Sequence, residues 1–266
     1  PPGNPVSAVL LKAEHLSLSF PDLTLFHDAC FEIPTRSRTV LLGKNGSGKT
    51  TLAEFIIKTQ ESPAQQDDTF SKRALTISPG VQIGYFKQDF SCLDADKTIL
   101  ENVMESSAKP EHEVRTILAR LLIARDDVHK KISVLSGGEK VKVSLARILV
   151  SKANFLILDE PTNYLDVFSM EALEKVLCAY AGTLLIISHD RRFIENTGRR
   201  LLLIDSGEIR TFEGSIGEYE SKQKEKLRAG ASENSLDSSV IEMRLAELSS
   251  RIDACRDEKL KEDLEK

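Results

Sequence analysis

The chain has no tryptophan, and only 9 prolines, 14 glycines and 4 cysteines occur among its 266 residues. The cysteines stand alone in the sequence, without metal-ligand spacing, which argues against a disulfide framework and against a zinc site. There is no apolar run of about 18 residues or more, so the sequence predicts neither a membrane span nor a signal peptide. We expect a cytoplasmic protein with reduced thiols. The four cysteines are Cys30, Cys92, Cys178 and Cys255.

The chain also lacks an excess of positive charge, with 36 Lys and Arg against 41 Asp and Glu and a formal net charge of −5. Affinity for nucleic-acid phosphates comes from clusters of Lys and Arg, so this balance disfavours a nucleic-acid partner without excluding one. Four arginines close in sequence form either a local basic patch or ordinary scattered surface charge. They are Arg191, Arg192, Arg199 and Arg200.

A glycine-rich loop, Gly43-Lys44-Asn45-Gly46-Ser47-Gly48-Lys49-Thr50, fits the phosphate-binding pattern G-x-x-x-x-G-K-[ST]. Residues 40–42 predict a buried strand before it, and residues 51–58 predict a helix after it. In such a loop the backbone N–H groups surround phosphates, Lys49 supplies positive charge and Thr50 offers a hydroxyl to Mg²⁺. The pattern predicts binding of a nucleoside triphosphate and disfavours a turn that binds nothing.

A second phosphate-binding surface is predicted at Leu135-Ser136-Gly137-Gly138-Glu139, because residues 140–150 behind it have helical apolar spacing. Ser136 and the two glycines then lie at a helix start, where outward-pointing N–H groups favour an anion.

Polar residues also follow two apolar runs. Residues 155–158 predict a strand buried on both faces, which ends in Asp159 and Glu160. Residues 183–187 predict another, followed by Ser188-His189-Asp190. In open α/β sheets the carboxyl ends of strands lie beside the phosphate loop, so we expect both carboxylates near it. Two adjacent buried carboxylates need a cation or polar ligand.

Taken in order, GKNGSGKTT, LSGGE, LILDEP and ISHD make the chain similar to the nucleotide-binding domain of an ATP-binding cassette ATPase. The resemblance covers residues 7–220. It implies an α/β P-loop NTPase fold with a central, mostly parallel sheet, an antiparallel β-subdomain and a helical subdomain at residues 90–148 that carries LSGGE. Residues 1–6 are expected to be a linker remnant, and residues 221–266 a polar linker with an amphipathic helical extension.

The resemblance also implies roles for single residues. ATP would be held by the loop from Gly43 to Thr50 with Thr51, by Phe20 stacking on adenine, and by a partner's Ser136, Gly137 and Gly138. Mg²⁺ would be held by Thr50, Gln88 and Asp159. Glu160 would polarise the attacking water, with His189 as switch histidine, and Asp166 would communicate across a dimer. From the residues alone, Phe20 is also compatible with core packing, Gln88 with a solvated loop and His189 with a helix cap.

A single cassette is incomplete in this family, where the LSGGE string of one cassette covers the nucleotide on the phosphate loop of another. One loop and one LSGGE string therefore imply a second cassette, in the same polypeptide or in a homodimer. ATP would close the pair, and hydrolysis would release it.

Further residues resemble the F subfamily, in particular Asn163 in Glu160-Pro-Thr-Asn163 and the string Asp190-Arg-Arg-Phe193. Tyr164 departs from the histidine that is most frequent there. The short segment between Gln88 and Leu135 is similar to that of a C-terminal cassette. The subfamily implies action on the ribosome and tRNA, as a translation factor or in ribosome protection with antibiotic resistance. Two alternatives remain open, the ATPase subunit of a membrane transporter and a DNA-associated clamp.

Overall fold

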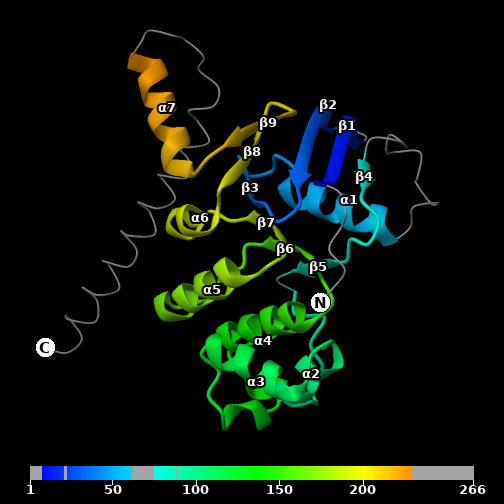
Figure 1. Cartoon of the computed structure of the whole chain (residues 1–266), viewed down its shortest axis with the longest axis vertical. Coiled ribbons are helices and arrows are strands. Elements are labelled where there is room, and N and C mark those ends of the chain that lie inside the picture. Colours follow the sequence, from blue (N-terminus) through cyan, green and yellow to red (C-terminus); the bar gives the residue numbers. More distant parts are fainter. Residues whose placement is uncertain (1–7, 21–22, 62–74, 88, 229–266) are drawn as a thin grey trace, which may run out of the picture.

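The computed structural model describes residues 8–20, 23–61, 75–87 and 89–228 (Figure 1). The strands are β1 Val9–Phe20, β2 Leu23–Pro34, β3 Arg38–Gly43, β4 Leu75–Ile77, β5 Ile83–Phe86, β6 Phe155–Asp159, β7 Thr183–Ile187, β8 Arg200–Asp205 and β9 Glu208–Glu213. The α-helices are α1 Lys49–Glu61, α2 Ile99–Glu105, α3 Glu111–Arg120, α4 Gly137–Val150, α5 Val167–Ala179, α6 Arg191–Thr197 and α7 Ile216–Arg228.

These elements form two sheets, and the predicted α/β fold is confirmed. The central sheet has the order β5-β6-β7-β3-β8-β9 and is parallel except for β9, which pairs antiparallel with β8. A second, antiparallel sheet has the order β2-β1-β4. In the central sheet β7 lies between β6 and β3, so the segments that follow these three strands meet at one edge.

The central strands are buried on both faces, as their uninterrupted apolar runs predict. Alternate side chains of β6 point to opposite faces: Phe155 and Ile157 pack with α1 and the second sheet, whereas Leu156 and Leu158 pack with the remaining helices. Figure 1 shows the same layers, with α1 beside β1 and β2 and with α5 and α6 on the other side of the central strands. The central sheet is thus covered by apolar side chains on both faces.

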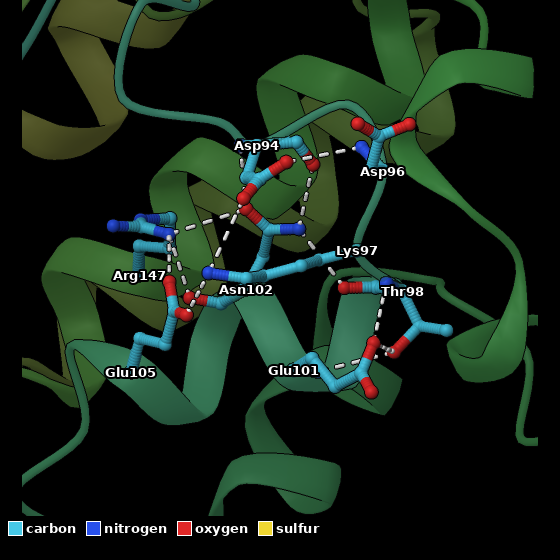
Figure 2. Close-up of polar contacts among 8 residues, drawn as sticks. All are labelled: Asp94, Asp96, Lys97, Thr98, Glu101, Asn102, Glu105 and Arg147. Carbon is cyan, nitrogen blue, oxygen red and sulfur yellow. Dashed lines mark hydrogen bonds and ion pairs between the residues drawn. The ribbon is translucent and has the colours of Figure 1, made fainter.

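Helices α2, α3 and α4 form a separate group at one end of the molecule (Figure 1). Fully buried Asn102 on α2 holds this group together (Figure 2). Its amide donates to the carbonyl oxygens of Asp94 and Thr98, both at 3.0 Å, and its Oδ1 accepts from the Asp94 N–H at 2.9 Å. Arg147 on α4 donates to the Asn102 carbonyl oxygen at 2.7 Å. Asn102 thus joins the loop before α2 to α4, the helix that begins within LSGGE.

Helix α7 differs from the expectation for residues 221–266. Residues 221–228, expected to be part of a polar linker, continue the helix that begins at Ile216. Its first turns are anchored by Tyr219 and by Glu220, which accepts two hydrogen bonds from Arg191 at 3.1 and 2.7 Å. The helical extension predicted beyond residue 228 lies outside the described residues, as does the linker remnant at residues 1–6. None of the described helices is long and apolar enough to cross a membrane.

Candidate functional site

A pocket of about 470 Å³ lies at the edge of the central sheet where β3, β6 and β7 end. It is lined by Asn45, Gly46, Gly48, Lys49, Thr50, Thr51, Asp159, Glu160, Asn163, Ile187 and His189. The phosphate loop, both carboxylates and the histidine predicted from three distant strings therefore face one space. Strand order explains why these residues meet. Strand β7 lies between β6 and β3, so the carboxyl ends of all three strands are neighbours at one edge of the sheet.

The phosphate loop turns directly from β3 into α1, whose first residue is Lys49. Gly48 has φ +93°, and a Cβ at this residue would come within 3.0 Å of the Phe26 ring, so the loop needs glycine here. The buried Lys49 ammonium donates to the carbonyl oxygens of Gly43 and Lys44 at 2.8 and 2.9 Å. The positive charge is thus held inside the loop, at the start of a helix that favours anions.

Thr50 and Asp159 lie side by side in the pocket lining, where the Thr50 hydroxyl donates to Asp159 Oδ2 at 2.8 Å. Burial raises the pKa of Asp159 above its ordinary value, while the Thr50 hydrogen bond and the Lys49 charge oppose this rise. A hydroxyl and a carboxylate are hard oxygen donors of the kind Mg²⁺ prefers, and Mg²⁺ usually takes further ligands from water and substrate phosphates. The donors fit a cation that binds together with a triphosphate.

Glu160 follows Asp159 with φ 49°, a left-handed conformation that is uncommon outside glycine and that turns its side chain into the pocket. Burial raises the pKa of Glu160 to about 7, and the neighbouring Asp159 charge adds to the rise. The His189 backbone N–H, which donates to Glu160 Oε2 at 3.3 Å, opposes it. A carboxyl group with a pKa near 7 is suited to accept a proton at neutral pH.

His189 follows β7 and faces the same carboxylate, with its Nε2 atom 3.3 Å from Glu160 Oε1. Burial lowers the pKa of His189, and the Lys49 charge lowers it further. The imidazole is therefore mainly neutral at pH 7, and it lies beside the Glu160 carboxylate. The helix-cap alternative for His189 is not what the structure shows, because Asp190 caps α6 by accepting from the Phe193 N–H at 2.8 Å.

The predicted second phosphate surface lies at the start of α4 and outside this pocket, since no residue from 136 to 138 lines it. Ser136 is the N-cap: its Oγ accepts from the Glu139 N–H at 3.3 Å, and its own N–H donates to the Glu139 carboxylate at 2.8 Å. A Cβ at Gly138 would lie 2.6 Å from the Tyr164 carbonyl oxygen. Glycine thus lets α4 approach the loop that begins at Glu160.

Three further predicted site residues remain: the side chains of two of them fall outside the described part of the chain, and Asp166 does not line the pocket. Gln88 lies outside the described residues. Phe20 is the last residue of β1, and its side chain also lies outside the described part of the chain. Asp166 is the N-cap of α5, with its two carboxylate oxygens accepting from the Ser169 N–H and hydroxyl at 2.8 and 3.1 Å. Its role across a dimer remains a prediction.

Two residues of the loop after Glu160 were not predicted as part of the site. Asn163 lines the pocket, and its N–H donates to the Glu160 carbonyl oxygen at 3.3 Å. Tyr164 has φ 66° and contacts the start of α4. Their position directly after the paired carboxylates could have predicted this. When a strand ends at a pocket, the turn that follows the strand also lies near that pocket.

The four clustered arginines do not form a basic patch. Arg191, Arg192 and Arg200 each pair with a carboxylate, on Glu220, Glu171 and Glu213 respectively. Arg199 donates to backbone carbonyl oxygens of residues 195, 196 and 198. Three of the four charges are thus paired with carboxylates within the chain.

Together, the phosphate loop, the carboxylates on the neighbouring strand and the strand order define a P-loop nucleoside triphosphatase. Residues 26–163 match the family model described as ABC transporter. The chain belongs to this family, as an ATP-binding cassette of the F type. It is thus an ATP-binding ATPase domain.

Three relatives illustrate the similarity. The chain is 39% identical over 222 residues to "Putative ATP-binding protein YdiF" of Bacillus subtilis, an alignment that covers 82% of the chain and 33% of that protein. It is 33% identical over 239 residues to "Energy-dependent translational throttle protein EttA" of Escherichia coli, covering 88% and 42%. It is 32% identical over 215 residues to "ABC transporter F family member 5" of Arabidopsis thaliana, covering 80% and 30%. The matched part thus amounts to between about a third and two fifths of each relative.

Proposed function

We propose that the domain hydrolyses ATP by in-line attack of a water molecule held by Glu160. One observation carries this proposal: a single pocket presents a buried ammonium, a hydroxyl–carboxylate pair and a carboxyl group whose pKa burial raises to about 7. Lys49 and the N–H groups of its loop would bind the β- and γ-phosphates, and Glu160 would accept the water proton. His189, beside Glu160, would hydrogen-bond the γ-phosphate.

Mg²⁺ would be held by Thr50 and Asp159 as part of this proposal, with Gln88 completing its surroundings. When bound, it would neutralise charge on the phosphate oxygens. Within the chain, Thr50 and Asp159 keep each other oriented through their hydrogen bond, while Glu160 is held by His189 and lines the pocket where the water would bind. Separate roles for two adjacent carboxylates follow from their different contacts.

Replacement of Glu160 by Gln tests this mechanism, because the amide preserves shape and cannot accept the proton. ATP binding should persist while turnover falls by about a hundredfold or more. Hydrolysis at the parental rate in the paired protein would show that Glu160 is not the group that activates water.

We infer further that two cassettes close on ATP. The start of α4 does not line the pocket of its own chain, so Ser136, Gly137 and Gly138 would meet the triphosphate of a partner cassette. Only a γ-phosphate would satisfy both surfaces, and its loss would remove the contact that keeps the pair closed.

The partner cassette most simply belongs to the same polypeptide, since the chain spans only part of the length of its relatives. We propose that this is the C-terminal cassette of a two-cassette protein that acts on the ribosome, near the peptidyl-tRNA. Similarity to a protein named as a translational throttle supports this choice. Housekeeping translation and ribosome protection against antibiotics are both compatible with the site, because both would use the same closure.

Co-sedimentation with 70S ribosomes tests the ribosome proposal. The polypeptide that contains both cassettes would carry Glu160→Gln and the equivalent change in its other cassette, which holds ATP in the closed pair. Pelleting with ribosomes in ATP but not in ADP is the expected result. A protein that binds ATP and stays in the supernatant would contradict ribosome action and favour the transporter-subunit or DNA-clamp alternatives.

A further inference from the structure

The Tyr85 hydroxyl is buried and has no hydrogen-bond partner among the described residues. Other buried atoms in this situation belong to Arg38, Glu174 and Arg200, whose side chains bond through a different atom, and to Ser47 of the phosphate loop. Buried polar groups nearly always have a partner in the protein, in ordered water or in an ion. The Tyr85 hydroxyl is therefore a candidate for a contact with water or an ion.

The position of Tyr85 is fixed by β5, which pairs in parallel with β6 so that Tyr85 lies beside Ile157. Both side chains point to the α1 face of the sheet, where Tyr85 packs against the same apolar cluster as Ile157. Asp159 lies two residues beyond Ile157, and alternate residues of a strand share a face. Tyr85 and Asp159 are therefore neighbours on one face, close to the pocket edge.

Helix α1 brings a second carboxylate to this place. Glu54 lies one helical turn after Thr50, whose hydroxyl bonds Asp159, and Lys87 pairs with Glu54 at 3.2 Å. Burial raises the pKa of Tyr85, and the charges of Asp159 and Glu54 raise it further. The phenol thus stays protonated, under the influence of the Asp159 and Glu54 carboxylates but without a hydrogen bond to either of them.

A donor that faces carboxylates without touching them leaves room for a bridging water molecule. A divalent cation held by Thr50 and Asp159 would bring such water, because Mg²⁺ keeps several waters in protein sites. We propose that Tyr85 is a positioning residue whose hydroxyl donates to a water in the hydration shell of this cation. The inference rests on the proposed cation site and adds a contact from β5 to it.

The test compares Tyr85→Phe with Tyr180→Phe. Tyr180, like Tyr85, has a partly buried side chain, but its hydroxyl donates to the Ala153 carbonyl oxygen at 2.8 Å, within the protein. Both variants lose one hydroxyl group, and they differ in whether the described structure supplies its partner. Thermal unfolding and binding of an ATP analogue with an imido β–γ bridge are measured for the parent and both variants, with EDTA or with increasing MgCl₂.

Tyr85→Phe should match or exceed the parent's melting temperature in EDTA, because no bond within the protein is lost. It should bind the analogue normally in EDTA, yet need roughly threefold to tenfold more Mg²⁺ for half-maximal stabilisation, the worth of one neutral hydrogen bond. Tyr180→Phe should melt at a lower temperature in EDTA and keep the parent's Mg²⁺ dependence.

Three results would overturn the inference: an unchanged Mg²⁺ dependence of Tyr85→Phe, a lower melting temperature of this variant in EDTA, or equally weakened analogue binding with and without Mg²⁺. Stabilisation of the parent protein by analogue and Mg²⁺ distinguishes failure of this inference from failure of the proposed function. A parent that is not stabilised by analogue and Mg²⁺ contradicts the cation site itself, whereas a stabilised parent with an unaffected Tyr85→Phe contradicts only the role of Tyr85.

Discussion

At the scale of single residues, the site places Glu160 where its charge is unfavourable. Its side chain is 18% exposed, lies next to Asp159 and has a left-handed backbone conformation. Burial raises its pKa from the ordinary 4.5 to about 7. The same burial that suits Glu160 to proton transfer therefore destabilises its ionised form in the folded domain.

A pH-dependent gain in stability should follow from Glu160→Gln. Between about pH 4.5 and 7 the folded state binds more protons at Glu160 than the unfolded state, so this residue's contribution to the free energy of unfolding falls as pH rises. At pH 8 without nucleotide, the neutral amide should raise the free energy of unfolding by about 1–3 kcal/mol, and this gain should fall to about a quarter of that value by about pH 5. Urea unfolding between pH 5 and 8 measures it.

Glu208 provides the control for this prediction, because its side chain is 64% exposed and pairs with Arg210 at 3.1 Å at the surface. Glu208→Gln should change the free energy of unfolding by less than about 0.5 kcal/mol at any of these pH values. If both substitutions behave alike at pH 8, the ionised Glu160 is not destabilising and its pKa is not raised.

At the scale of elements, two helices begin with the same capping box. Thr98 and Glu101 cap α2 as Ser136 and Glu139 cap α4, with reciprocal hydrogen bonds of similar length. In local structure the two helix starts are equivalent. What distinguishes α4 is the glycine pair behind Ser136 and its approach to Tyr164.

Thr98→Ala and Ser136→Ala should therefore have the same effect on stability and different effects on activity. Each removes one cap and should lower the free energy of unfolding by about 1 kcal/mol. Only Ser136→Ala should reduce ATP turnover of the paired cassettes, on the order of a hundredfold, since it removes a donor to the partner's γ-phosphate. Urea unfolding and phosphate release measure the two effects. Equal turnover of the two variants would contradict the role of Ser136.

The polar network in Figure 2 combines a buried centre with an exposed margin. Asn102→Ala would leave the Asp94 N–H and two carbonyl oxygens without their partner, and should lower the free energy of unfolding by about 2–3 kcal/mol. Lys97 pairs with Asp94 and Glu105 at the surface, and Lys97→Met should change it by less than about 1 kcal/mol. Chemical denaturation of both variants checks this difference, and comparable losses would show that burial does not decide the strength of this network.

Elements differ in how well sequence predicts them. Strands β6 and β7 could be predicted because burial on both faces requires an unbroken apolar run, and their strand ends then predicted the site. Residues 221–228 of α7 could not be recognised as helical, because part of the helix's anchorage is polar: Glu220 is buried against Arg191 of α6. The contact of Gly138 with Tyr164 could likewise not be predicted from the sequence, since the left-handed backbone conformation of Tyr164 depends on tertiary packing.

At the scale of the whole molecule, the structure separates two phosphate-binding surfaces that the proposed reaction must unite. The pocket lies at the edge of the central sheet, whereas Ser136 begins α4 in the helical group and lines no part of that pocket. On the proposed mechanism, each chain would offer one surface to its own triphosphate and the other to the triphosphate of a partner. In a symmetric pair, both composite sites would use Lys49 from one chain and Ser136 from the other.

This division predicts complementation between two inactive variants of the isolated chain. Lys49→Ala removes the phosphate-binding charge and Ser136→Ala removes the trans donor, so a homodimer of either variant has no complete site. In a mixed dimer, the pocket of the Ser136→Ala chain meets the intact Ser136 of the Lys49→Ala chain. Phosphate release by an equimolar mixture should recover to roughly a quarter of the parental rate, because half of randomly formed dimers are mixed and each contains one complete site of two.

The parental chain, assayed at the same total concentration, gives the reference rate, and a Lys49→Ala/Ser136→Ala double variant mixed with parental chain gives the control. That mixture contains mixed dimers in which neither composite site is complete, so its activity should come from its parental homodimers alone, about a quarter of the parental rate when mixed in equal amounts. Activity of the first mixture, with each of its variants inactive alone, would require that Lys49 and Ser136 act on one nucleotide from different chains. If each single variant retains activity alone, or if their mixture stays inactive while both remain folded, the two surfaces do not form a shared site between copies of this chain.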